Sequence, residues 1–214
     1  AEVQALQEIQ VSINALDCYP AKHLEGSYIS LNDLNDRKTV GIKNLFYFDN
    51  GSTVFEQNTH DNRWHVRWVL RERGITLLGP KPASLMPPIP LKEMFDEIKS
   101  AMRETVEIFQ AEVNSPLGFC NSRFGQSFFV LTYCRMLHSL ATGTVQSKKA
   151  GAAWAKQFVQ AQWVPLIDQA WQEREGVRFC VKIRQRAEQA VLNETLEFIR
   201  YAVLLSDQIQ VQTS

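Results

Sequence analysis

The chain contains 214 residues, enough for one large domain or two small ones, and its 45% hydrophobic and 21% charged residues are typical of a globular protein. Lysine plus arginine and aspartate plus glutamate each number 23, so the formal net charge is zero, which argues against general nucleic-acid binding through a basic surface. No apolar stretch approaches the roughly 20 residues that span a bilayer, and the four cysteines include no CxxC pair. We therefore expect a cytoplasmic protein with no membrane or nucleic-acid partner and no zinc ribbon.

The N-terminal part of the sequence combines helix patterns with short strand patterns. Apolar residues recur every three or four positions through residues 1–16, which predicts a helix. The Asp49-Asn50-Gly51 turn separates two strand patterns, and a short apolar run between Gly74 and Gly79 predicts a buried strand. The predicted strands are Leu24–Leu31, Leu45–Phe48, Thr53–Gln57 and Ile75–Leu78, and a second helix is predicted at Asp61–Arg73.

Residues 79–90 are the best candidate for a domain boundary. They hold five prolines and show no periodicity, and proline prevents a helix from continuing. We therefore expect a mixed α/β domain over residues 1–85 and a helical domain over residues 86–214.

The helical domain is predicted from apolar residues at spacings of three and four. These spacings mark five helices, at Leu91–Phe109, Phe124–Ala141, 148–160, 163–173 and Arg184–Ser206. The short connections favour an up-and-down bundle. The predicted fold class is therefore α+β and mostly α, with a partial mixed sheet followed by a bundle of about five helices.

One turn within the bundle has an unusual charge pattern. Gly143 ends the second helix, and Ser147 is a favourable cap for the third. Lys148 and Lys149 then fall in the first turn, where the helix dipole disfavours positive charge. A nearby phosphate would relieve this conflict. The alternative is that both lysines simply point into water.

The segment Tyr133–Ala155, YCRMLHSLATGTVQSKKAGAAWA, resembles the C-terminal helical domain of the aminoglycoside adenylyltransferases of the streptomycin/spectinomycin resistance type. That family shows an arginine-containing aromatic helix, a Thr-Gly turn, a lysine-containing cap and an Ala-x-Trp helix at this spacing. The resemblance continues in Gly74–Pro80, Trp163–Asp168 and Leu196–Tyr201. It covers most of the chain.

The resemblance implies an antibiotic-resistance enzyme that uses ATP and Mg²⁺ to transfer AMP to a hydroxyl of an aminoglycoside or a similar small molecule. In this superfamily a Gly-Ser turn precedes an Asp-x-Asp strand that holds the metal. Neither Gly26-Ser27, followed by Asp33, nor Gly51-Ser52, followed by Asp61, matches that pattern. We therefore expect the chain to begin downstream of the metal-binding strand and to be inactive by itself.

Four residues are assigned by their positions in the resemblance. Glu25 matches the proposed catalytic base, which would also bind the metal; a lone glutamate on a strand is otherwise a solvated surface residue. Asn62, Lys148 and Tyr201 match positions that face the nucleotide. Apart from the resemblance, Asn62 is equally well explained as a helix cap, and Tyr201 as a core or boundary residue.

The residues expected to contact the substrate depart from the family pattern. Members that act on streptomycin have tryptophan in place of Leu137 and aspartate in place of Lys149. Because Lys149 would repel a polycationic drug, streptomycin fits poorly. Glu25, Tyr47 and Asp49 are the candidates for a substitute acidic or aromatic contact, in a cleft between the α/β piece and the bundle.

A second interpretation is a non-catalytic module, in which the helical domain binds a nucleotide or a partner. In either case a small sheet with an open edge invites pairing with another chain. We therefore expect self-association.

Overall fold

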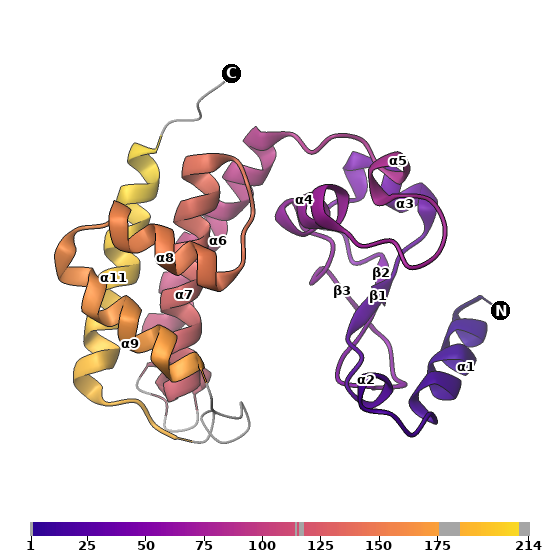
Figure 1. Ribbon diagram of the computed structural model, residues 1–214, viewed down its shortest axis with the longest axis horizontal. Helices are drawn as coiled ribbons and strands as arrows, with labels where there is room; N and C mark the ends of the chain where they lie inside the picture. Colours follow the sequence, from indigo (N-terminus) through magenta and orange to yellow (C-terminus); the bar gives the residue numbers. More distant parts are fainter. Residues whose placement is uncertain (1, 114, 116–117, 176–184, 210–214) are drawn as a thin grey trace. The chain divides into compact units, whose positions relative to one another are not determined.

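The computed structural model describes all residues except 1, 114, 116–117, 176–184 and 210–214. The chain divides into two compact units, residues 1–90 and residues 91–214 (Figure 1). Helices dominate the described residues, and a small antiparallel sheet lies in the first unit. The predicted α+β, mostly α fold class is confirmed. No helix among these residues is long and apolar enough to cross a membrane.

The first unit surrounds its sheet with short helices. Its helices are α1 (Glu2–Asn14), α2 (Tyr19–Lys22), α3 (Leu31–Asn35), α4 (Trp64–Arg73) and α5 (Pro82–Leu85), and its strands are β1 (Gly26–Tyr28), β2 (Leu45–Phe48) and β3 (Glu56–Asn58). The strand predicted at Leu45–Phe48 has the predicted bounds. The other two strands are shorter or shifted relative to the predicted segments.

The sheet has the order β1-β2-β3, and both pairings are antiparallel. Phe46 lies opposite Tyr28, and their rings join Phe48 and Phe55 in an aromatic cluster with centroids 5.5–6.2 Å apart. Ser27 lies opposite Tyr47. Because side chains alternate along a strand, Ser27 and Tyr47 share the face opposite the aromatic cluster.

The predicted turn after β2 is confirmed by its backbone. Asn50 and Gly51 have positive φ angles of 52° and 74°. Gly51 also donates its N–H to the Leu24 carbonyl over 2.8 Å. A Cβ atom at position 51 would lie 2.5 Å from the Lys22 carbonyl oxygen, so this turn needs glycine.

The buried strand predicted at Ile75–Leu78 is wrong. These residues form no strand, and the side chains of Ile75, Leu77 and Leu78 are 87%, 95% and 96% exposed. An apolar run becomes a buried strand only where a neighbouring strand can satisfy its backbone. Here the three described strands pair only with one another.

A buried arginine holds the first unit together. Arg67 of α4 is only 3% exposed. Its guanidinium donates to the carbonyls of Asp33, Leu34 and Asp36, to Thr39 Oγ1 and to Asn62 Oδ1, over 2.9–3.3 Å. These five bonds match the five N–H donors of arginine. They tie α4 to α3 and to the short 3₁₀ turn Arg37–Thr39 that follows it.

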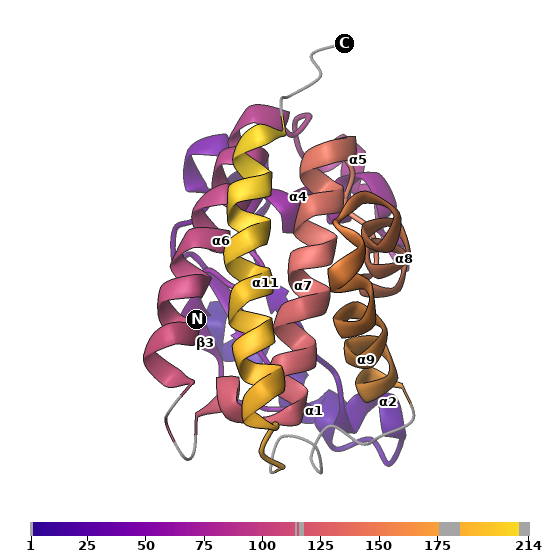
Figure 2. The same ribbon diagram turned by 90° about the vertical axis from the view of Figure 1, so that its left-hand side faces the viewer.

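The second unit is a helical bundle, as predicted. Its described helices are α6 (Leu91–Glu112), α7 (Arg123–Thr142), α8 (Lys148–Phe158), α9 (Val164–Arg174) and α11 (Gln189–Gln208). Short 3₁₀ turns lie at Phe119–Asn121 and Ala161–Trp163. Residue 184, where the last helix was predicted to start, lies outside the described residues. The central helix is α7, which packs against the other four (Figure 2).

Two glycines and a serine cap define the corner between α7 and α8. Gly143 adopts the left-handed conformation, with φ of 68°, and Ser147 Oγ accepts the N–H of Ala150 over 3.2 Å. Both features confirm the predicted turn. A Cβ atom on Gly151 would lie 2.8 Å from the Cα atom of Arg135. The absent side chain therefore lets α8 approach the backbone of α7 closely.

Replacement of Arg67 by methionine should lower the free energy of unfolding by about 3 kcal/mol, because several buried acceptors lose their donor at once. Urea unfolding followed by tryptophan fluorescence measures this change. The matched control is Arg63→Met, which alters an exposed arginine at the start of the same helix. Equal effects of the two changes would contradict the structural role of Arg67.

Gly151→Ala should destabilise the bundle by about 1–3 kcal/mol through overpacking, although alanine favours an isolated helix by about 1 kcal/mol. Thermal unfolding followed by circular dichroism tests this. Ala153→Gly, at an exposed position of α8, measures the propensity effect alone. A higher melting temperature for Gly151→Ala would show that α7 and α8 do not approach as described.

Candidate functional site

The predicted base Glu25 lies directly before β1, on the sheet face that also carries Ser27 and Tyr47. Its Oε1 atom accepts a hydrogen bond from the Tyr47 hydroxyl over 2.9 Å. Its side chain is 55% exposed. The carboxylate is therefore oriented by one bond and still reachable from solvent, and its Oε2 atom has no hydrogen-bond partner among the described residues.

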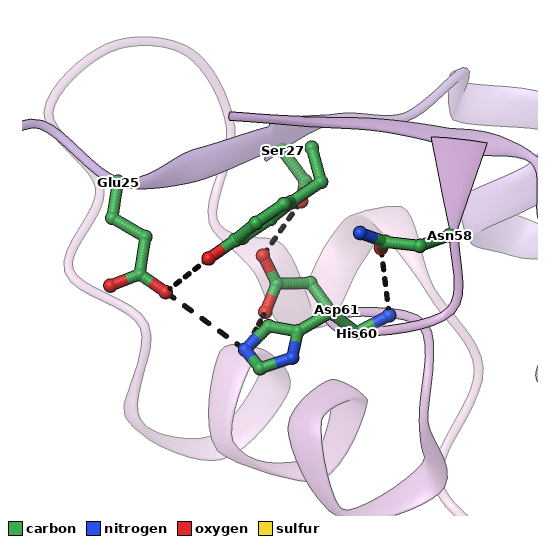
Figure 3. Close-up of polar contacts among 6 residues, drawn as sticks. Glu25, Ser27, Asn58, His60 and Asp61 are labelled. Carbon is green, nitrogen blue, oxygen red and sulfur yellow. Dashed lines mark hydrogen bonds and ion pairs between the residues drawn. The ribbon is translucent and has the colours of Figure 1, made fainter. Parts of the chain in front are cut away.

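Histidine 60 lies between two carboxylates (Figure 3). His60 Nε2 is 3.9 Å from Glu25 Oε1 and 4.0 Å from Asp61 Oδ1. The other Asp61 oxygen, Oδ2, accepts a hydrogen bond from Ser27 Oγ over 2.6 Å. The His60 backbone N–H is held by Asn58 Oδ1 over 2.9 Å. The turn after β3 thus brings Asp61 and His60 to the Glu25 side of the sheet.

The Tyr47 phenol has the most perturbed environment of this cluster. Burial, the hydrogen bond to Glu25 and the negative charges of Glu25, Asp49 and Asp61 all raise the pKa of Tyr47. The phenol therefore stays protonated and serves as a hydrogen-bond donor. Its ring centroid lies 5.0 Å from that of His60, so Tyr47 contacts both ends of the cluster. Asp49 is exposed at the turn that follows β2.

The described side chains do not by themselves form a complete magnesium site. Mg²⁺ has near-octahedral oxygen coordination and is usually bound through one or two carboxylates together with substrate phosphates and water. No group of three or more His, Cys, Asp or Glu side chains in the described part of the chain could hold a metal ion. Glu25 and Asp61 instead face His60 from two sides, and each already accepts a hydrogen bond from a hydroxyl group.

Asn62 lies in the interior of the first unit and is fully buried. Its amide nitrogen contacts the carbonyls of Thr39 and Ile42 and Oδ1 of Asn44 over 2.6–3.1 Å, and its oxygen accepts from Arg67. Asn62 lies one residue before Arg63, the residue at the N-cap position of α4. In this structure its polar atoms stabilise the fold around Arg67.

Lys148 is half-buried at the start of α8. Its Nζ atom lies over the ring of Phe128, 3.5 Å from the centroid. Burial, followed by the positive charges of Arg174 and Arg135, lowers the pKa of Lys148 to about 7. The interpretation that both lysines simply point into water is therefore wrong for Lys148, whereas Lys149 is exposed.

The remaining predicted site residues of the bundle differ in exposure. Leu137 is fully buried on the inner side of α7. Lys149 Nζ lies 5.9 Å from the centroid of the Trp171 ring on α9. Tyr201 of α11 is half-buried, and its hydroxyl accepts the Gln160 N–H over 3.2 Å. The structure brings Lys148 and Lys149 together at one corner of the bundle.

Sequence reasoning missed several residues around Glu25 in the first unit and around Lys148 in the second. Asp61 and Ser27 each belong to a Gly-Ser/Asp pair that did not match the family pattern, yet their side chains meet across 34 positions. This contact can be found only when the pairing of β1, β2 and β3 is known. Arg135 and Arg174 were missed because charged residues near helix surfaces are common and only helix packing places them beside Lys148.

Comparison with known proteins identifies the family. The family model described as aminoglycoside adenylyltransferase, C-terminal domain, matches residues 84–201, which is more than half of the chain. Proteins named aminoglycoside (3'') (9) adenylyltransferase are 29% identical over 130 residues in Klebsiella pneumoniae and 26% identical over 136 residues in Rhizobium radiobacter. A spectinomycin 9-adenylyltransferase of Staphylococcus aureus is 28% identical over 108 residues.

These matches cover 61%, 64% and 50% of this chain but only 44%, 45% and 35% of the respective relatives. The chain thus spans less than half the length of the relatives that it matches. The predicted resemblance is confirmed, and the chain belongs to the aminoglycoside adenylyltransferase family.

Proposed function

We propose that the protein transfers AMP from ATP to a hydroxyl group of an aminoglycoside or a similar small molecule, and so confers antibiotic resistance in the cytoplasm. The observation that carries this proposal is the family match over residues 84–201. Residues 1–85 would supply the α/β side of the enzyme and residues 86–214 the helical side.

In the proposed reaction, the acceptor hydroxyl attacks the α-phosphorus of ATP, its O–H proton passes to a base, and pyrophosphate leaves. Glu25 suits the role of base, because Tyr47 orients Oε1 and leaves Oε2 for the substrate proton. A carboxylate that is half exposed can be reached by a substrate without movement of the backbone. His60 and Asp61 extend the polar surface around this base.

Lys148 and Tyr201 would contribute to nucleotide binding from the bundle, and Asn62 would support it from the first unit. Lys148 has the clearest support, since a half-buried lysine at a helix N-terminus gains most from a bound phosphate. The Asn62 amide is saturated by Thr39, Ile42, Asn44 and Arg67. Its contribution would therefore be to hold the surrounding loops in place.

On the first unit, Tyr47 and Asp49 would contact the acceptor. On the second unit, Lys149 is exposed and could contact it, whereas Leu137 is fully buried and would act only through the packing of α7. Asp49 and the neighbouring Glu25 and Asp61 favour a cationic acceptor. Lys149 is exposed and disfavours the most highly charged drugs. We therefore propose an acceptor with fewer positive charges than streptomycin.

The test is transfer of label from α-³²P-ATP to a panel of aminoglycosides and spectinomycin by the intact protein that carries this chain. We expect a labelled product with at least one drug, and a loss of rate of about 100-fold or more in Glu25→Gln, because a general base contributes on that scale.

The matched control for Glu25→Gln is Glu8→Gln, which removes an exposed carboxylate from α1 of the same unit. It should leave the rate nearly unchanged. Absence of labelled product with every acceptor, or an equal loss in both variants, would contradict the proposed function.

A further inference from the structure

Glu25 lies in a short irregular segment, residues 23–25, between α2 and β1. Such a segment is not fixed by the regular hydrogen bonds of a helix or a strand. A general base nevertheless works only within hydrogen-bond reach of the proton that it takes. The position of Glu25 therefore depends on the contacts that this segment makes with the rest of the first unit.

The turn after β2 holds this segment at two consecutive residues. Gly51 donates its N–H to the Leu24 carbonyl over 2.8 Å, one residue before Glu25. The Nδ1 atom of His23 lies 3.0 Å from Oδ1 of Asn50. Because a carbonyl oxygen only accepts, the imidazole donates this hydrogen bond. We call His23, Leu24, Asn50 and Gly51 the turn clamp.

The residue after Glu25 is held by the sheet. Gly26 lies opposite Phe48 in the pairing of β1 with β2, and a Cβ atom at position 26 would lie 3.1 Å from the Phe48 ring. Tyr47, the neighbour of Phe48, donates to the Glu25 carboxylate. The strand β2 and its turn thus contact the backbone on both sides of Glu25 as well as its side chain.

The turn clamp depends on the residue types at its two turn positions. Asn50 has a φ angle of 52°, a conformation that asparagine, aspartate and glycine adopt most readily. Gly51 is buried against the Lys22 carbonyl, where a Cβ atom does not fit. Asn50 and His23 are both exposed and belong to no helix or strand. Their hydrogen bond therefore joins two loops and does not hold the core together.

We propose that Asn50 and His23 are positioning residues for Glu25. Their hydrogen bond, together with the bond between Gly51 and Leu24, sets where the Glu25 carboxylate stands relative to an acceptor hydroxyl. This inference rests on the proposed nucleotidyl transfer for the role of Glu25 as base, whereas the turn clamp itself rests on the contacts above. Asn50 and His23 act through the backbone of residues 23–25 and not by touching the substrate.

Steady-state kinetics of AMP transfer by the intact protein that carries this chain tests the role of Asn50. Asn50→Gly tolerates the left-handed backbone and removes only the side-chain hydrogen bond. It should lower kcat by about 2- to 10-fold, the equivalent of one hydrogen bond, and leave KM nearly unchanged. Asn50→Asp keeps an acceptor oxygen and the same backbone, so it should restore kcat.

The matched control is Gly79→Ala, which strains another left-handed glycine, with φ of 86°, in a different loop of the same unit. It should leave kcat unchanged. A loss of kcat in Gly79→Ala equal to that in Asn50→Gly would show that the rate follows general strain and would contradict the proposal.

A double-mutant cycle tests whether Asn50 acts through His23. His23→Phe removes the donor nitrogen but keeps a ring at the position where the imidazole lies 4.3 Å from the Tyr19 ring. If the hydrogen bond is the cause, the two single variants should lose similar rates, and the double variant should lose no more than either. Additive losses would overturn the proposal, because the two residues would then act separately.

Nuclear magnetic resonance observes the turn clamp without any reaction. In Asn50→Gly, the Gly51 amide should exchange its hydrogen about 2- to 10-fold faster, since its bond to Leu24 loses a supporting contact. The order parameter of the Glu25 amide should fall below the value of about 0.85 that is typical of a rigid backbone. Both quantities should match the parent in Asn50→Asp.

These measurements separate the two proposals. An unchanged Glu25 amide in Asn50→Gly, or an unchanged kcat in an active Asn50→Gly protein, would contradict the positioning role and leave the proposed function standing. If the parent protein transfers no AMP while the Glu25 amide responds to Asn50→Gly as expected, the turn clamp stands and the proposed function fails.

Discussion

The cost of burying positive charge organises both units of this protein. In the first unit, Arg67 is almost completely buried, and its five N–H groups are satisfied by loop carbonyls, a hydroxyl group and Asn62. That solution fixes α4 against α3 and the loops between them, and it places the turn that carries His60 and Asp61. In the second unit, Lys148 is half-buried over the Phe128 ring, and burial lowers its pKa to about 7. An arginine whose donors are all satisfied internally stabilises a fold, whereas a half-buried lysine at a helix N-terminus would gain from a bound anion.

In the proposed reaction, the two candidate sites would divide the chemistry of nucleotidyl transfer. The sheet of the first unit presents a carboxylate held by a phenol, which suits proton removal from an acceptor hydroxyl. The bundle presents positive charge at a helix N-terminus, which suits a phosphate group. Gly151 permits the close contact between α7 and α8 beside Arg135. This contact places Lys148, at the start of α8, next to α7.

The sequence predicted the bundle well, because a helix that packs on a core repeats its apolar residues every three or four positions. Gly143 and Ser147 were also predicted correctly, since left-handed glycines and serine caps are local signals. The sequence failed at Ile75–Leu78, where the apolar run has no neighbouring strand. It could not distinguish Arg67 from Arg63 and Arg71, which follow the same spacing of four. The contact between Ser27 and Asp61 depends on sheet register, which no local pattern reveals.

The most direct test of the account is the titration of Lys148 by nuclear magnetic resonance, with its side chain assigned through Lys148→Arg. The chemical shift of its Cε carbon, followed from pH 5 to pH 11, reports the pKa of this single amine. The account predicts a midpoint near pH 7 in the free protein, and a midpoint displaced to distinctly higher pH when pyrophosphate is present. A midpoint close to 10.4, the ordinary value for lysine, in both conditions would show that Lys148 is solvated. That result would contradict the proposal that Lys148 is held half-buried at the start of α8 to meet a bound phosphate.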